Sequence, residues 1–230
     1  MTNQAKKLYP HAPIEELLPG LWRVAGSMAL PIERSMFVYR LGDGSLLLDS
    51  VVAMEEAGMR ALEALGPPTV MVVPHPKHTM DAAFYKRRYP SIRVLGESDA
   101  QAKVEELLFD DTPEQGLPPL GITPHLVPGM NVSEVVLELP LEGGGRALLF
   151  TDLINRNEGP TNIVMRLVGP PGDGGVARIL KLTQIDDVEQ VRAFLKQMAA
   201  LPSLQLIAGC HGGVVTDGCA DWLTQAANQL

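Results

Sequence analysis

Four short apolar runs in this sequence are each followed by side chains that can ligate a metal ion. They are residues 46–48 before Asp49, residues 70–73 before His75 and His78, residues 148–150 before Asp152, and residues 206–208 before His211. Short apolar runs of this kind are typical of buried strands. Because the ends of neighbouring strands can direct side chains from distant parts of a chain at one point, the sequence predicts a site at one edge of a sheet.

Strand and helix patterns alternate along the rest of the chain. We expect strands at residues 21–24, 36–39, 46–50, 69–73, 92–95, 135–139, 147–150 and 204–208. We expect helices at residues 54–66, 81–89, 188–198 and 220–229, and a further helix that begins with the capping box Ser98-x-x-Gln101. This order of elements predicts an α/β (α+β) fold in which two packed sheets carry helices on their outer faces.

The segment from Asn155 to Gly175 is dense in glycine and proline. It lacks the lysine and the helix start of a phosphate-binding loop. Because it follows Asp152 closely, we expect a mobile loop beside the cleft that can act as a lid.

The composition narrows the classes of function and partner. Nineteen basic and 27 acidic side chains give a net charge of −8, with no basic run, so we expect no nucleic-acid partner. No stretch approaches the ~18 continuous apolar residues of a membrane span, so we expect no membrane partner, and the N-terminal residues do not resemble a secretory signal. Two cysteines without a C-x-x-C spacing favour a reducing, cytoplasmic setting.

A chain of 230 residues can bury a core without disulfides or a structural metal, so a metal here would serve function. We expect residues 1–16 to form a poorly structured leader and residues 17–230 a single domain. The expected partner is a small-molecule ligand or substrate, and the oligomeric state stays open.

Motifs along residues 17–230 resemble those of the metallo-β-lactamase fold superfamily. In chain order they are GLWRV, LLLDS, the strand that ends in histidines, VPGMN, LLFTD and IAGCHG. Asp49 matches the structural aspartate of the first sheet, Asp152 the aspartate that bridges two metals, and His211 the final histidine. The resemblance implies a four-layer αββα sandwich with a metal site at one edge of the central sheets. Most members with an intact site hydrolyse lactams, lactones, thioesters, phosphoesters or related bonds.

The metal motifs depart from the superfamily pattern. Where that pattern has H-x-H-x-D-H, the chain keeps His75 but has Lys77, Thr79 and Met80 at the other ligand positions. In the next motif, G-H-T, Met130 stands where the histidine belongs. A thioether is a soft donor unsuited to zinc beside carboxylates, and a protonated lysine opposes a dication. The chain therefore resembles most closely an uncharacterised branch with altered metal motifs, and a two-metal site is not expected.

Two interpretations of the altered site stay open. The first is a site for one Zn²⁺ or Fe²⁺ whose ligands are His75, His78, Asp152 and His211. Asp152 or Asp81 would then orient the water that attacks an ester, a lactone or a related bond, although an acidic residue at the start of a helix also has a structural explanation. The second is a metal-free, non-catalytic protein that binds a small ligand or serves as a scaffold, in which Lys77 is either an anion-binding group or a solvated surface side chain.

Overall fold

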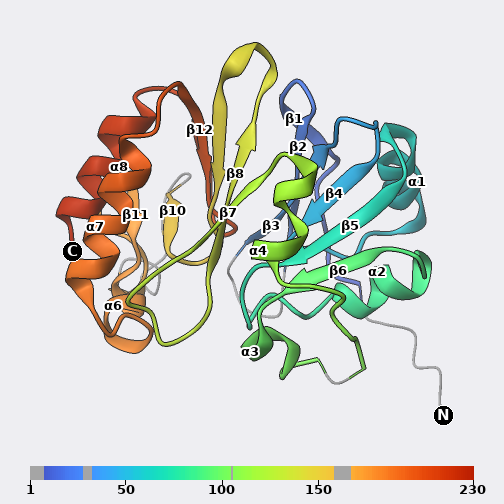
Figure 1. Ribbon diagram of the computed structural model, residues 1–230, viewed down its shortest axis with the longest axis horizontal. Coiled ribbons are helices and arrows are strands. Elements are labelled where there is room, and N and C mark those ends of the chain that lie inside the picture. The colour runs from blue at the N-terminus through green and yellow to red at the C-terminus, as the bar shows by residue number, and fades with distance from the viewer. Residues whose placement is uncertain (1–7, 28–32, 105, 158–166) are drawn as a thin grey trace.

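Two mixed sheets lie face to face, and helices cover their outer faces (Figure 1). The computed structural model describes residues 8–27, 33–104, 106–157 and 167–230. Among these residues, the larger sheet has six strands, the second has five, and a further small sheet has two. The predicted αββα arrangement is confirmed.

The first sheet begins as an antiparallel meander and ends with parallel strands. In spatial order its strands are β1 (Glu15–Leu18), β2 (Leu21–Gly26), β3 (Arg34–Arg40), β4 (Leu46–Asp49), β5 (Pro68–Val73) and β6 (Arg93–Gly96). Parallel neighbours need a crossover, and the helices α1 (Glu56–Leu65) and α2 (Ala82–Arg88) supply it after β4 and β5. Asp49 pairs with Val72 in the parallel ladder, so the carboxyl ends of β4 and β5 lie side by side.

The second sheet has a parallel pair at its centre. In spatial order its strands are β13 (Val214–Val215), β12 (Leu204–Ala208), β9 (Arg146–Leu149), β8 (Val135–Pro140) and β7 (Thr123–Leu126). The helices α7 (Val188–Ala199) and α8 (Cys219–Asn228) cover its outer face (Figure 1). Ala208 pairs with Leu149 in the parallel ladder, so the ends of β12 and β9 also lie side by side.

Shorter elements connect these layers. They are the helices α3 (Ser98–Gln101), α4 (Pro113–Gly116) and α6 (Arg178–Thr183), and the 3₁₀ turns η1 (Pro118–Leu120) and η2 (Glu142–Gly144).

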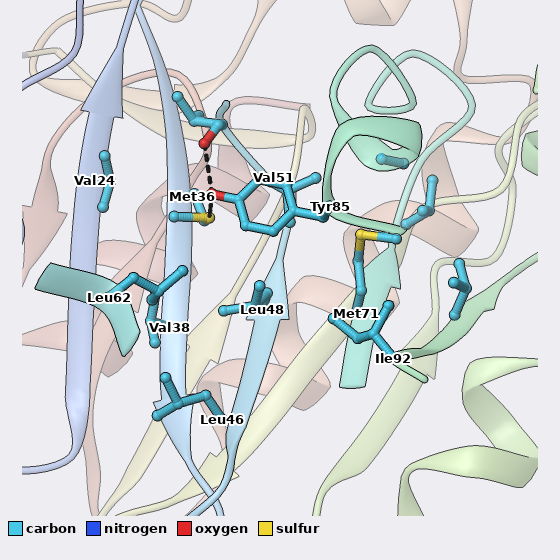
Figure 2. Close-up of a cluster of buried hydrophobic side chains, with 14 of the residues drawn as sticks. Val24, Met36, Val38, Leu46, Leu48, Val51, Leu62, Met71, Tyr85 and Ile92 are labelled. Carbon is cyan, nitrogen blue, oxygen red and sulfur yellow. Dashed lines mark hydrogen bonds between the residues drawn. The ribbon is translucent and has the colours of Figure 1, made fainter. Parts of the chain in front are cut away.

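Three clusters of buried apolar side chains fill the spaces between the four layers. The cluster in Figure 2 lies between the first sheet and its helices and contains Leu48 and Tyr85. Leu47, the neighbour of Leu48 in the same strand, points to the opposite face and belongs to the cluster between the sheets. Leu223 of α8 belongs to the third cluster, against the second sheet. Since burying one such side chain contributes about 1.5–3 kcal/mol, the sandwich holds the strand ends in fixed positions.

Two expectations about local structure need correction. α3 spans only Ser98–Gln101, and its N-cap is Glu97, without a side-chain cap. The Gln101 amide instead donates to the main-chain oxygens of Val104 and Leu107, where it closes a loop in place of a capping box.

The expected loop at residues 155–175 contains regular structure at both ends. β10 (Ile154–Arg156) pairs antiparallel with β11 (Gly174–Val176). The hydrogen bonds that pair β10 with β11 come from the main chain and need no apolar side chains. The glycine-rich segment therefore shows no alternating apolar pattern from which β11 could be predicted. Residues 158–166 of the expected lid lie outside the described residues.

Residues 8–16 of the expected leader are joined to the first sheet. His11 forms an isolated bridge with Gly26, and β1 begins at Glu15. Both cysteines, Cys210 and Cys219, are free and buried. Among the described residues, no helix combines the length and the apolar character that crossing a membrane requires.

Candidate metal centre

The ends of four strands bring the predicted site residues to one edge of the sandwich. Asp49 ends β4, and His75 and His78 follow β5 in the first sheet. In the second sheet, Asp152 follows β9 and His211 follows β12. Because each pair of strands is parallel and adjacent, their carboxyl ends meet at this edge.

Asp152 is the centre of the site. One carboxylate oxygen, Oδ1, lies 3.0 Å from Nε2 of His78 and 3.0 Å from Nε2 of His211. The other oxygen, Oδ2, lies 3.8 Å from Nε2 of His75. Donor atoms of His75, His78 and Asp152 all lie within 4.8 Å of one another. His211 is outside this mutual set and reaches it through Asp152.

Main-chain contacts hold His211 in place. Its main-chain N–H donates to Oδ1 of Asn155 at 3.0 Å, and its Nδ1 lies 2.8 Å from the main-chain oxygen of Glu33. Nδ1 must carry a proton to donate to this carbonyl, which leaves Nε2 to face Asp152. Gly209 permits the arrangement, since a Cβ at that position would lie 1.9 Å from the main-chain oxygen of Ile154.

Ser50 orients His78 from the other side. The Ser50 hydroxyl is hydrogen-bonded to Nδ1 of His78, while Nε2 of that ring faces Asp152. Ser50 has a φ of 54°, in the left-handed region that a non-glycine residue rarely adopts. Backbone conformations of this kind cluster at functional sites, and here the turn directs the hydroxyl toward His78.

His75 is fully buried, and both of its ring nitrogens have neighbours. The main-chain N–H of Lys77 donates to Nδ1 at 3.1 Å, so the proton of the neutral ring sits on Nε2. Nε2 then donates to Oε1 of Gln184 at 3.2 Å.

Burial and mutual hydrogen bonding shift the pKa values of the cluster in different directions. Burial lowers the pKa of His75 to about 4 and also lowers that of His78. For His211, burial is outweighed by the hydrogen bond and charge of Asp152, and its pKa rises. For Asp152, the hydrogen bonds from His211 and His78 outweigh burial, and its pKa falls well below the usual value. An ionised carboxylate beside two largely neutral imidazoles is suited to a divalent cation.

Two further carboxyl groups are buried beneath the cluster. Burial, reinforced by the neighbouring negative charges, raises the pKa values of Asp49 and Glu134 to about 8. Glu134 accepts hydrogen bonds from the main-chain N–H groups of Thr151 and Leu153, on either side of Asp152. Glu134 therefore fixes the turn that carries Asp152.

Asp81 was expected as a second catalytic carboxylate, but it is not part of the group formed by His75, His78 and Asp152. It is buried, and its Oδ2 accepts hydrogen bonds from the guanidinium of Arg34 and, at 2.8 Å, from the main-chain N–H of Ala53. These contacts tie β3 and the segment after β4 to the start of α2.

A cavity of about 290 Å³ opens beside the donors. Its polar lining includes Asp152, His78, His211, Arg34 and Lys77. Its apolar wall includes Val51, Met80, Val168, Pro170, Ile179 and Leu180. The described residues of the expected lid therefore lie beside the cleft, as predicted. The cavity suits a small molecule with apolar parts and a negatively charged or polar group.

The donors fit a single metal ion better than two. Two imidazoles and one carboxylate are a common ligand set for zinc or iron. Nδ1 of His78 is hydrogen-bonded to Ser50, as the second ring nitrogen of a metal-ligating histidine usually is, whereas Nδ1 of His75 accepts from Lys77 and must take up the ring proton before Nε2 can bind an ion. Lys77 is exposed, and Met130 packs against the core of the second sheet. Neither side chain adds a donor for a second ion.

The sequence did not identify Ser50, Gln184, Asn155 or Glu134 as parts of the site. Ser50 directly follows Asp49, the last residue of β4. The search for polar residues just after apolar strands could therefore have included it. Gln184 follows a short helix and carries no motif, and only the folded chain places it beside His75.

No protein-family model matches the chain, and no curated protein matches it. Solved structures do match. The mono-zinc form of the metallo-β-lactamase FIM-1 from Pseudomonas aeruginosa is 14% identical, with 97% of each chain covered and a TM-score of 0.65. A metallo-β-lactamase from Hirschia baltica is 15% identical, with 94% of this chain and 98% of that chain covered and a TM-score of 0.61. One from Erythrobacter litoralis is 14% identical over 94% and 96% of the two chains, with a TM-score of 0.64. The chain has the metallo-β-lactamase fold, as its motifs predicted.

Proposed function

We propose that this protein binds one divalent metal ion, Zn²⁺ or Fe²⁺, and hydrolyses an ester, a lactone or a related bond in a small molecule. The observation that carries the proposal is the group His75, His78 and Asp152, whose donor atoms lie within 4.8 Å of one another, with His78 and Asp152 lining the cavity. His211, whose Nε2 lies 3.0 Å from Oδ1 of Asp152, completes the proposed ligand set.

One ion is proposed, because the side chains that would serve a second are replaced. Lys77, Thr79, Met80 and Met130 stand at those positions. A mono-zinc form is known for FIM-1, a metallo-β-lactamase with the same fold, which supports a single ion as a workable state of this architecture.

When bound, the ion would supply Lewis acidity and an activated water nucleophile. Asp152, kept ionised by the hydrogen bonds from His211 and His78, accepts hydrogen bonds and can orient the attacking water. Lys77 lines the cavity and can hold a negatively charged group of the substrate. The apolar wall around Ile179 and Leu180 can contact an apolar part of the substrate.

The test is chelator-sensitive hydrolysis of an aryl ester and a panel of lactones. We expect wild-type activity to disappear with a chelator and to return with zinc or iron, and His78→Ala to reduce it by about 100-fold or more, as the loss of a metal ligand should. The matched control is His125→Ala, because His125 pairs with Glu138 at 2.8 Å on the second sheet, outside the donor cluster. Hydrolysis that survives the chelator, or no hydrolysis of any of these substrates, would overturn the proposal.

A metal-free binding protein is the second candidate, and one observation favours it. The proton of His75 sits on Nε2, the atom that would face an ion, because Lys77 donates to Nδ1. Asp152 and the histidines also satisfy one another by hydrogen bonds. If this candidate holds, small carboxylates will bind equally well to chelator-treated and zinc-treated protein, and Lys77→Ala will weaken their binding.

A further inference from the structure

A buried amide next to the cluster is only partly satisfied. Gln184 has 3% of its surface exposed, and its Nε2 has no hydrogen-bond partner among the described residues. A buried amide group left unpaired loses its hydrogen bonds to water without replacing them, which destabilises the folded protein. Its Oε1 lies 3.2 Å from Nε2 of His75, so the other end of the amide is directed at a candidate ligand.

The position of Gln184 relative to the altered motif is the second observation. Its main-chain oxygen accepts a hydrogen bond from the N–H of Asn131 at 2.9 Å, and Ile185 forms an isolated bridge with Met130. The Met130 side chain packs against the core of the second sheet, and its thioether is a poor donor for zinc. A neighbouring segment thus brings a polar side chain to the region in which Met130 leaves no donor.

The spacing of the oxygen and nitrogen atoms suits one ion. Two donors bound to the same ion at about 2.1 Å lie roughly 3.0–3.4 Å apart. The 3.2 Å between Gln184 Oε1 and His75 Nε2 falls in this range, and the 3.8 Å between His75 Nε2 and Asp152 Oδ2 needs only a small closure. An amide oxygen is a harder donor than the Met130 thioether and is compatible with zinc, iron or manganese.

We infer that Gln184 is a further ligand, whose Oε1 binds the same ion as His75 and Asp152. This inference rests on the proposed function, since it requires that an ion binds. A ligand set that includes Gln184 would contain an amide oxygen in addition to histidine and carboxylate donors. The competing explanation is that Gln184 only accepts the Nε2 proton of His75 in the metal-free protein.

The two explanations predict opposite changes in metal affinity. If Gln184 is a ligand, Gln184→Leu replaces the donor amide by an apolar side chain of similar shape. Zinc affinity should then fall by about tenfold or more. If it only holds the His75 proton, the same change removes a competitor of the ion, and affinity should be unchanged or higher. Gln184→Glu keeps an oxygen donor and should keep or increase the affinity.

The measurement is competition for zinc with a chromophoric chelator, on wild type, both Gln184 variants and Gln229→Leu. Gln229 is the matched control, because its amide donates to the main-chain oxygen of Gly174 at 3.1 Å, whereas the Gln184 amide lies against His75. Affinity that is unchanged or higher in Gln184→Leu overturns the inference, as does a tenfold loss in Gln184→Glu. Wild type that binds no zinc, iron or manganese overturns the proposed function and this inference together. If Gln184→Leu does not fold, Gln184→Asn takes its place, because the shorter side chain withdraws the amide oxygen: a tenfold loss of zinc affinity supports the inference, and unchanged or higher affinity overturns it.

Discussion

His78 and His211 lie with their ring centroids 5.2 Å apart and direct their Nε2 atoms at the same oxygen of Asp152. They come from different sheets, so this shared oxygen joins the two halves of the sandwich at the site. Both Nε2 atoms carry a proton when they donate to Asp152. An ion that binds there must displace those protons.

Metal binding should therefore release protons and depend on pH. The pKa of His211 is raised by Asp152, so His211 is charged at lower pH and competes with the ion. We expect zinc affinity to rise with pH until the pH passes the pKa of His211, and then to level off. Calorimetry in buffers of different ionisation enthalpy measures the protons released. Affinity that is independent of pH between about 5 and 8, the range in which histidines usually titrate, would contradict this displacement.

Ser50 should act on the ion through His78. Ser50→Ala removes the hydrogen bond to Nδ1 and frees the ring to rotate, so we expect zinc affinity to fall by about 10–100-fold with the fold intact. Ser35→Ala is the control, because the Ser35 hydroxyl is buried without a hydrogen-bond partner among the described residues. Equal affinities for the two variants, measured by chelator competition, would show that Ser50 does not orient His78.

Asp81 should contribute more to stability than to the chemistry. Replacing Arg34 by methionine leaves the buried Asp81 carboxylate without its cationic partner, which should lower the free energy of unfolding by about 3–5 kcal/mol. The double variant Arg34→Met, Asp81→Leu should recover much of this loss, because it removes both charges. Urea denaturation measures both, and a loss below about 1 kcal/mol in the single variant would contradict the structural role.

Asp49 should make the metal-free fold less stable as the pH rises. Its pKa is raised to about 8 in the folded protein by burial and by the charge of Glu134. A raised folded pKa favours folding below the unfolded pKa of about 4, and this contribution is lost as the pH rises through about 8. Asp49→Asn lacks this dependence, so its stability relative to wild type should increase with pH, by at most about 1.4 kcal/mol per unit. Denaturation of chelator-treated protein at about pH 5 and about pH 8, which bracket the window between the two pKa values, checks the sign, and a constant difference would refute it.

Much of the fold could be predicted from the sequence, because apolar runs of strand length mark the layers. Leu46 to Leu48 and Leu206 to Ala208 are such runs, and the strands they form do end at one edge. The pairing of β10 with β11 could not be predicted, since Gly174 and Gly175 contribute main-chain hydrogen bonds and no apolar pattern. The expected capping box of α3 was wrong because Gln101 is used to close a loop.

The candidate site was predictable to the extent that its residues follow strands. His75, His78 and Asp152 come together as donors, and His211 shares Asp152 with His78. Gln184 reaches His75 only through the packing of the segment after α6 against the segment around Met130, a contact that local sequence does not encode. Which ligands an ion would take, and whether Asp81 has a chemical role, stay predictions.

The number of metal ions per chain tests the central claim most directly. Elemental analysis should be made on protein purified without a chelator, and again after incubation with zinc, iron or manganese and removal of the excess. The single-ion account predicts one equivalent per chain, held by His75, His78 and Asp152. Two equivalents, or none even after incubation, would contradict it.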